Sequence, residues 1–218
     1  MTVEFKHAAT PSDMRFRLGL CGYFLACGFL ALWILWPAVL ASIETKDDRG
    51  EAAHQLAKDA VLRGDLWTNA ALAQAERLFQ TTAADRSFVI RTGETAERAV
   101  RLSPHDARLW LVLAAAELLQ EGARTTGFLK MSYYTGTNEI SLMPRRFLVA
   151  AAAGAADEEL RAMMRGELRT MARRRPKMDS AIEAAWRAGT PQAQALIAAT
   201  LADIDPHFAR RLRAGDTR

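Results

Sequence analysis

The chain has 218 residues, which is enough for one domain of ordinary size and an anchor but too few for two substantial domains. Half of the residues are hydrophobic and a quarter are charged, a balance that excludes a largely disordered chain. The 29 basic residues exceed the 25 acidic ones only slightly, so the charge does not indicate a nucleic-acid partner.

An uncharged apolar segment lies near the N-terminus, over residues 18–43. At about 1.5 Å per residue, about 20 helical residues cross a hydrocarbon core of roughly 30 Å, so this segment predicts one transmembrane helix. A signal peptide cleaved near Ala41 is the alternative, although the apolar segment is longer than the usual roughly 7–15 residues. Both cysteines, Cys21 and Cys27, lie in this segment, so we expect no disulfide or thiolate site elsewhere.

Basic residues set the expected orientation of this helix. Arg15 and Arg17 adjoin its N-terminal side, which by the positive-inside rule makes residues 1–17 a cytoplasmic segment. The composition, rich in alanine and arginine, suggests a bacterial host. We therefore expect a single-pass protein of the bacterial inner membrane with a periplasmic C-terminal domain.

Helical patterns fill the rest of the chain, and no alternating β-strand pattern interrupts them. We predict a juxtamembrane helix over 44–64, a helical-repeat domain over 65–205 and a C-terminal tail over 206–218. Turns and caps divide the domain into helices after Asp65, over 85–102, over 106–121, from Gly122 to Tyr134, from Pro144 to Gly154, after Asp157, after Pro176 and after Thr190.

The predicted helix over 106–121 is apolar almost all round, with Leu109, Leu111, Val112 and Leu113 in succession. A helix with no polar face is buried on all sides. We therefore expect it at the centre of the domain.

One helix junction resembles the tetratricopeptide repeat. Residues 96–114 place Ala99 and Pro104 before a run that contains Trp110, Leu113 and Ala114, as at the junction of two such repeats. The resemblance implies stacked antiparallel helical hairpins, an α-solenoid in which these five residues pack the repeats together. Such folds usually bind peptides or other proteins.

The resemblance is incomplete and covers about one repeat, residues 92–126. Glu117 stands where the family has tyrosine, and Thr126 and Lys130 stand where alanine and phenylalanine are expected. The fold prediction is therefore all-α, with a degenerate tetratricopeptide-like solenoid after the transmembrane helix; an unrelated helical bundle is the alternative. The string over 131–139 also resembles one in uncharacterised alphaproteobacterial membrane proteins.

Signatures of catalysis are absent from the sequence. The four histidines are isolated from one another, and no phosphate-binding loop or nucleophile elbow is present. Paired carboxylates occur at Asp47-Asp48 and Glu158-Glu159, where they complement the dipoles of predicted helix starts. We expect no catalytic residue, cofactor or metal.

Arginines recur every four residues on one predicted helix, at Arg161, Arg165, Arg169 and Arg173, and Arg174, Arg175 and Lys177 extend this row. Like charges at this spacing cost about 0.2–0.5 kcal/mol each, so this arginine ridge should meet anions. Either Asp179 and Glu183 of the next helix or water supplies them, or the ridge binds an anionic lipid, an anionic glycan or an acidic protein surface.

The turn over 131–139 is a second candidate for binding, through Tyr133, Tyr134 and Asn138. Tyrosine combines a rigid apolar ring with a polar tip, which suits recognition. The alternative is that these aromatic rings pack onto their own hairpin.

Together these features predict a non-enzymatic, membrane-anchored protein-interaction scaffold, with cell-envelope or exopolysaccharide assembly as the process suggested by fold analogy. An accessory subunit that binds an anionic lipid or glycan through the arginine ridge is the alternative. An enzyme with an unfamiliar site would need a perturbed carboxylate or tyrosine in a closed polar pocket.

Overall fold

The computed structural model describes residues 64–80 and 85–215, together with Leu25, Cys27 and Gly28. The predicted cytoplasmic segment, and the transmembrane and juxtamembrane helices apart from these three residues and Gly64, lie outside the described residues. Within the described part of the chain, no helix is both long enough and apolar enough to cross a membrane. The chain divides into two compact units, and the helices below all belong to the second, residues 53–218.

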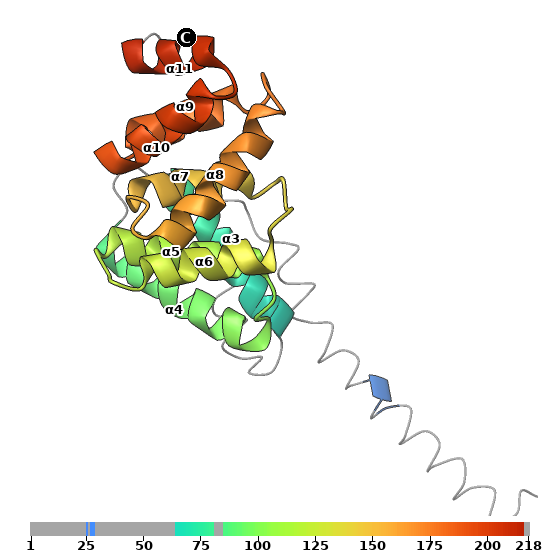
Figure 1. Cartoon of the computed structure of the whole chain (residues 1–218). Helices are drawn as coiled ribbons and strands as arrows, with labels where there is room; N and C mark the ends of the chain where they lie inside the picture. The colour runs from blue at the N-terminus through green and yellow to red at the C-terminus, as the bar shows by residue number, and fades with distance from the viewer. Residues whose placement is uncertain (1–24, 26, 29–63, 81–84, 216–218) are drawn as a thin grey trace, which may run out of the picture. The chain divides into compact units, whose positions relative to one another are not determined.

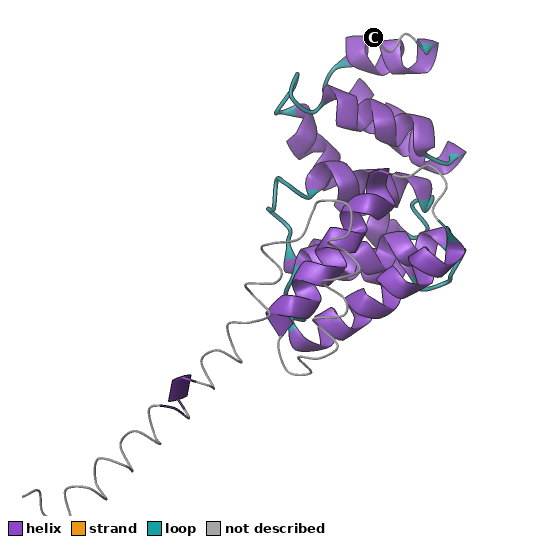
Figure 2. Cartoon of the chain, turned by 180° about the vertical axis from the view of Figure 1, so that it is seen from behind, coloured by secondary structure: helices purple, strands orange, loops and turns teal. Residues whose placement is uncertain are grey.

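The regular structure of the described part of this unit is entirely α-helical, which confirms the predicted all-α class (Figure 1). Seen from behind, the same helices are joined by loops without any strand between them (Figure 2). The helices are α3 (Gly64–Gln80), α4 (Arg86–Leu102), α5 (Ala107–Leu119), α6 (Thr125–Thr135), α7 (Met143–Ala152), α8 (Glu158–Ala172), α9 (Asp179–Ala188), α10 (Pro191–Ala202) and α11 (Pro206–Ala214).

Short polar side chains begin several of these helices as the sequence predicts. Asp106 and Asp157 accept hydrogen bonds from the backbone N–H groups of Arg108 at 3.0 Å and Leu160 at 2.8 Å. These bonds pair amide groups that have no carbonyl partner in the first helical turn. Pro144 lies in the first turn of α7, where its missing N–H costs nothing.

Helix α5 lies at the centre of the unit, as its all-round apolar sequence predicts. Leu109, Val112 and Leu113 pack with α3 and α4, whereas Leu111 and Ala114 pack with the cluster formed by the later helices. A single helix therefore belongs to both hydrophobic clusters.

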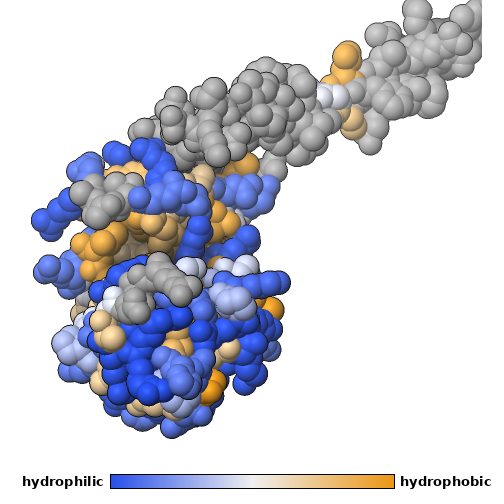
Figure 3. Space-filling model, turned by 90° about the horizontal axis from the view of Figure 1, so that it is seen from above, coloured by the Kyte–Doolittle hydropathy of each residue, from blue (hydrophilic) through white to orange (hydrophobic). Residues whose placement is uncertain are grey.

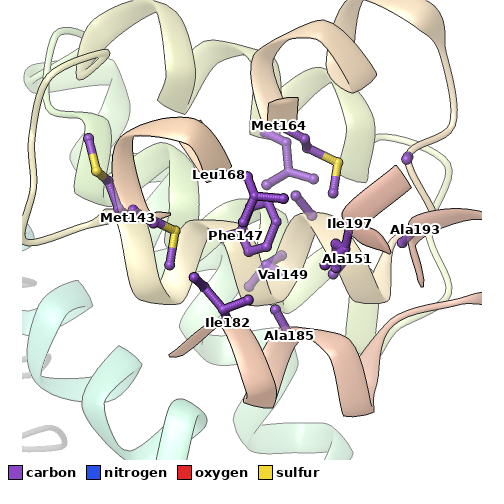
Figure 4. Packing of buried hydrophobic residues seen from close by; sticks show 14 of the residues in the cluster. Met143, Phe147, Val149, Ala151, Met164, Leu168, Ile182, Ala185, Ala193 and Ile197 are labelled. Carbon is purple, nitrogen blue, oxygen red and sulfur yellow. The ribbon is translucent and has the colours of Figure 1, made fainter. Parts of the chain in front are cut away.

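The order of packing changes along the chain. Helices α3 to α6 each pack against the next helix in sequence, but α7 packs mainly against α9, and α8 mainly against α10. Side chains from these four later helices meet in one cluster, which includes Phe147 of α7, Leu168 of α8, Ile182 of α9 and Ile197 of α10 (Figure 4). In the second half, α7 and α8 thus pack mainly with alternate helices, whereas α10 and α11 are again neighbours in sequence that pack together.

The segment expected to be a C-terminal tail contains a packed helix, α11. Asp205 caps it, Pro206 occupies its first turn, and Phe208, Ala209 and Leu212 are buried against the core. The Arg175 guanidinium lies 3.8 Å from the centroid of the Phe208 ring. A helix of nine residues offers only two turns of pattern, which is why the sequence predicts a tail here and not a helix.

The substitution Phe208→Ala tests whether α11 is part of the folded unit. We expect it to lower the free energy of unfolding by about 3–5 kcal/mol because it opens a cavity under α11. Urea unfolding followed by circular dichroism measures this loss, and Leu119→Ala, at an exposed position, is the control. Equal, small losses in both variants would contradict the assignment.

Candidate functional site

A pocket of about 410 Å³ lies between α6, α7 and α8. Its walls come from the end of α6, the turn that follows, the start of α7 and one face of α8. The lining residues are Tyr133, Tyr134, Thr137, Asn138, Met143, Met163, Gly166, Glu167 and Thr170. All three candidate binding residues of the 131–139 turn therefore line one pocket.

The two adjacent tyrosines differ in their exposure to solvent. Successive residues of an α-helix point about 100° apart, so only one of two neighbours can face the core. Tyr133 is buried, whereas Tyr134 is 56% exposed. The packing alternative therefore applies to Tyr133, whereas a binding role for Tyr134 stays a prediction.

A buried ion pair lies beside the pocket, and one of its two residues, Glu167, lines it. The Arg146 side chain is fully buried, and its Nε and Nη2 donate to Glu167 Oε1 at 2.9 and 2.7 Å. Tyr133 donates its hydroxyl to the other carboxylate oxygen, Oε2, at 2.5 Å. The guanidinium also lies 4.4 Å from the centroid of the Tyr133 ring. Together, Arg146 of α7, Glu167 of α8 and Tyr133 of α6 form what we call the buried triad.

Arg146 also fixes the end of α6. Its Nη1 donates to the carbonyl oxygens of Ser132 at 3.0 Å and Gly136 at 2.9 Å. A positive charge is favourable at a helix C-terminus because the last carbonyl groups carry partial negative charge. The turn that presents Thr137 and Asn138 to the pocket is therefore held by the same side chain that pairs with Glu167.

Burial shifts both acidic groups of the buried triad. It raises the pKa of the Glu167 carboxyl, although Arg146 and the Tyr133 hydroxyl oppose this shift. Burial, together with the charge of Glu167, raises the pKa of Tyr133 well above its usual value. The Tyr133 phenol therefore stays protonated and acts as a donor at neutral pH.

The exposed tyrosine belongs to a second polar network at the surface. Tyr134 donates its hydroxyl to Glu159, which also lies 2.6 Å from the Lys130 ammonium. The same ammonium lies 2.7 Å from Asp157. Lys130 lowers the pKa of Glu159, so this carboxylate stays ionised. Glu159 lies in the first turn of α8, as predicted, but it also positions a pocket residue.

On the α8 side of the pocket, one lining residue is a glycine and has no side chain. Gly166 lies in the middle of α8, and a Cβ atom built on it would meet nothing within 4 Å. The space beside this residue is therefore open, and the volume that a side chain would fill there belongs to the pocket.

Two of the four arginines of the predicted arginine ridge are paired with an acidic residue. Arg161 and Arg165 both bind Glu158, at 2.9 and 2.5 Å. No acidic partner for Arg169 or Arg173 is present among the described residues, and Arg173 Nη2 lies 3.2 Å from the hydroxyl oxygen of Thr170, a residue that lines the pocket. Arg173 thus contacts a lining residue, whereas Arg161 and Arg165 bind Glu158.

One of the two acidic partners expected for the ridge binds a residue that extends it, because Asp179 pairs with Arg175 at 2.5 Å. The other, Glu183, lies 3.8 Å from Arg211 of α11. Arg175 also pairs with Asp205, so it links the starts of α9 and α11. Among the described residues, Arg173 and Arg174 have no acidic partner from α9.

The residues expected to pack helical repeats lie where α4 meets α5. Ala99, Leu113 and Ala114 are buried, whereas Pro104 is exposed in the turn. Trp110 is half-buried and donates its Nε1–H to the Pro104 carbonyl at 2.7 Å.

Glu117, which departs from the family pattern, lies 3.0 Å from the Arg124 guanidinium. Arg124 in turn binds Glu97 at 3.1 Å. A carboxylate at this position is thus explained by an ion-pair network that joins α4, α5 and the start of α6.

Arg146 and Glu167 were missed in the sequence analysis. Each is a single charged residue on an otherwise apolar helix face, Arg146 beside Phe147 and Glu167 beside Leu168. A charge at such a position was the available signal, because charged side chains are rarely fully buried without a partner.

Comparison with known protein families, with curated proteins and with solved structures finds no match to this chain. Among the described residues, no three His, Cys, Asp or Glu side chains are grouped so as to hold a metal ion.

The substitution Arg146→Met tests the buried triad. We expect a loss of about 3–5 kcal/mol in the free energy of unfolding, because the Glu167 carboxylate is left buried without a cation. Arg145→Met is the matched control, since its exposed guanidinium pairs with Glu76 at 2.7 Å and contributes about 1 kcal/mol or less. Adding Glu167→Leu to Arg146→Met should restore part of the loss in urea unfolding, and a further loss would contradict the pairing.

The pH dependence of stability tests the burial of Glu167. A carboxyl whose pKa rises above 4.5 on folding contributes stability that is complete below that value and lost as the pH rises through the folded pKa. The advantage of the wild type over Glu167→Gln should therefore shrink from about pH 4 to about pH 7. Glu159→Gln is the control with the opposite sign, because the folded pKa of Glu159 is lowered. Equal slopes for the two variants in pH-dependent urea unfolding would contradict the assignment.

Proposed function

We propose that this chain is a non-enzymatic binding protein that docks a segment of a partner protein in the pocket between α6, α7 and α8. The observation that carries the proposal is the open space beside Gly166, on a wall where Glu167 and Thr170 are held by hydrogen bonds. Concave sites of about 300–1,000 Å³ with mostly apolar walls and a few placed polar groups are typical binding sites.

The rigidity of the wall supports this function. Tyr133 and Glu167 bind each other and Arg146, and Arg146 also holds the carbonyl groups of the following turn. A ligand would therefore meet side chains that are already ordered, so little conformational entropy is lost on binding.

The chemistry of the lining suits a side chain flanked by peptide backbone. Met143, Met163 and the ring of Tyr134 offer apolar contacts, and methionine adapts to irregular shapes. Asn138 is exposed, and its amide offers both donors and an acceptor to a peptide group.

We favour binding over catalysis because the perturbed groups are already engaged. Both oxygens of Glu167 accept hydrogen bonds within the buried triad, and its side chain is only 3% exposed. A general base must reach the proton that it removes. Anion binding by the entire arginine ridge is disfavoured because Glu158 neutralises Arg161 and Arg165.

In this proposal residues 18–43 anchor the chain in a bacterial inner membrane, and the helical unit works in the periplasm as a degenerate tetratricopeptide-like stack. The successive packing of α3 to α6 supports this reading of the fold. By fold analogy, the partner belongs to cell-envelope or exopolysaccharide assembly.

Site-specific photocrosslinking in cells tests the docking. A photoreactive residue at position 134 should give a discrete protein adduct, because Tyr134 is exposed at the pocket. Adding Gly166→Leu should abolish this adduct, since the new side chain extends into the space that is open around an added Cβ atom.

Gly127→Leu is the matched control for this experiment. Gly127 is an exposed glycine of α6 that also has nothing within 4 Å of an added Cβ, and it does not line the pocket. The adduct should survive in this variant, and both variants should remain folded. An adduct that persists in Gly166→Leu would refute docking in the pocket.

A further inference from the structure

We infer that the docked segment is acidic, with a carboxylate that binds Arg173 and Arg174 while an apolar neighbour enters the pocket. This inference rests on the proposed function and specifies its ligand. Four steps support it: the position of the two arginines, their lack of acidic partners, the charge of the segment that carries them and the lining of the pocket.

Arg173 and Arg174 continue the row of residues by which α8 lines the pocket. That row is Met163, Gly166, Glu167 and Thr170, and residues three and four positions apart lie on one helix face. Both arginines contact the last member of the row. Arg173 Nη2 lies 3.2 Å from Thr170 Oγ1, and Arg174 Nη1 lies 3.3 Å from the Thr170 carbonyl oxygen. Two guanidinium groups thus contact Thr170, the last residue of α8 that lines the pocket.

Neither guanidinium group has an acidic partner in the described part of the chain. The nearby carboxylates are engaged, because Arg175 binds both oxygens of Asp179, at 2.5 and 3.0 Å, and Arg146 binds Glu167. Each guanidinium carries five N–H donors in a planar fork that matches a carboxylate. Most of these donors remain available to a ligand.

The segment that carries these arginines is basic. Residues 169–215 contain nine Arg or Lys and four Asp or Glu. Seen from above, hydrophilic side chains cover much of the surface, with apolar areas among them (Figure 3). A positive surface raises the rate at which an acidic partner associates and disfavours basic partners.

The lining of the pocket points to an acidic peptide rather than to a free anion. Met163 and Met143 provide apolar contacts in the pocket whose lining on α8 ends at Thr170, and Asn138 offers an amide. A simple anion would use only the guanidinium groups. A peptide with a carboxylate beside an apolar residue would use all of these features.

Selection of peptides on the full-length chain in mild detergent tests the inference. A phage-displayed library of random dodecapeptides is panned on the wild type after depletion on Gly166→Leu, which retains the arginines but fills the pocket. We expect the enriched peptides to carry Asp or Glu next to an apolar residue.

Charge reversal then tests the arginines directly. Arg173→Glu combined with Arg174→Glu should weaken binding of an enriched peptide by about tenfold or more, measured by fluorescence anisotropy. Arg210→Glu combined with Arg213→Glu is the matched control, because it makes the same charge change near the end of another helix. Replacing the acidic residue of the peptide by its amide should weaken binding to the wild type but not to the first double variant.

The outcomes separate the two proposals. If no peptide distinguishes the wild type from Gly166→Leu, docking in the pocket fails. If peptides require the open pocket but bind equally well after reversal of Arg173 and Arg174, only the acidic ligand is refuted. Retention on anionic phospholipid vesicles that depends on these arginines but not on Gly166 would also refute it, because the ligand would then be a membrane surface.

Discussion

The buried ion pair between Arg146 and Glu167 is the interaction on which the site depends. Removing two charges from water costs several kcal/mol per ion, and good geometry with further hydrogen bonds must offset that cost. Here the carboxylate receives donors on both oxygens, and the guanidinium reaches two carbonyl groups as well. Because these partners come from α6, α7 and α8, the ion pair fixes three helices relative to one another.

The rest of the unit supports this arrangement through alternating contacts. Helix α5 joins the early hydrophobic cluster to the later one, while α9 and α10 pack behind α7 and α8. The two helices that hold the ion pair are therefore packed against α9 and α10 on the side away from solvent. Small residues at these contacts, such as Ala151, Ala185 and Ala193, allow the helices to approach closely.

Local chemistry made much of the fold predictable from the sequence. Asp106 and Asp157 begin helices because their side chains pair free amide groups, and Tyr133 and Asn138 share a pocket because one lies at the end of α6 and the other in the turn that follows. What could not be predicted depends on distant partners. Arg146 and Glu167 are 21 positions apart, and the packing of α7 on α9 skips the helix between them.

The glycine at position 166 has a consequence for any effort to make this protein more thermostable. Glycine in the middle of a helix is less favourable than alanine by roughly 0.5–1 kcal/mol, and nothing in the fold would obstruct a methyl group there. A screen for stability alone would therefore select larger residues at this position. Each such gain in stability would reduce the volume of the pocket, so stability and pocket volume compete at a single residue.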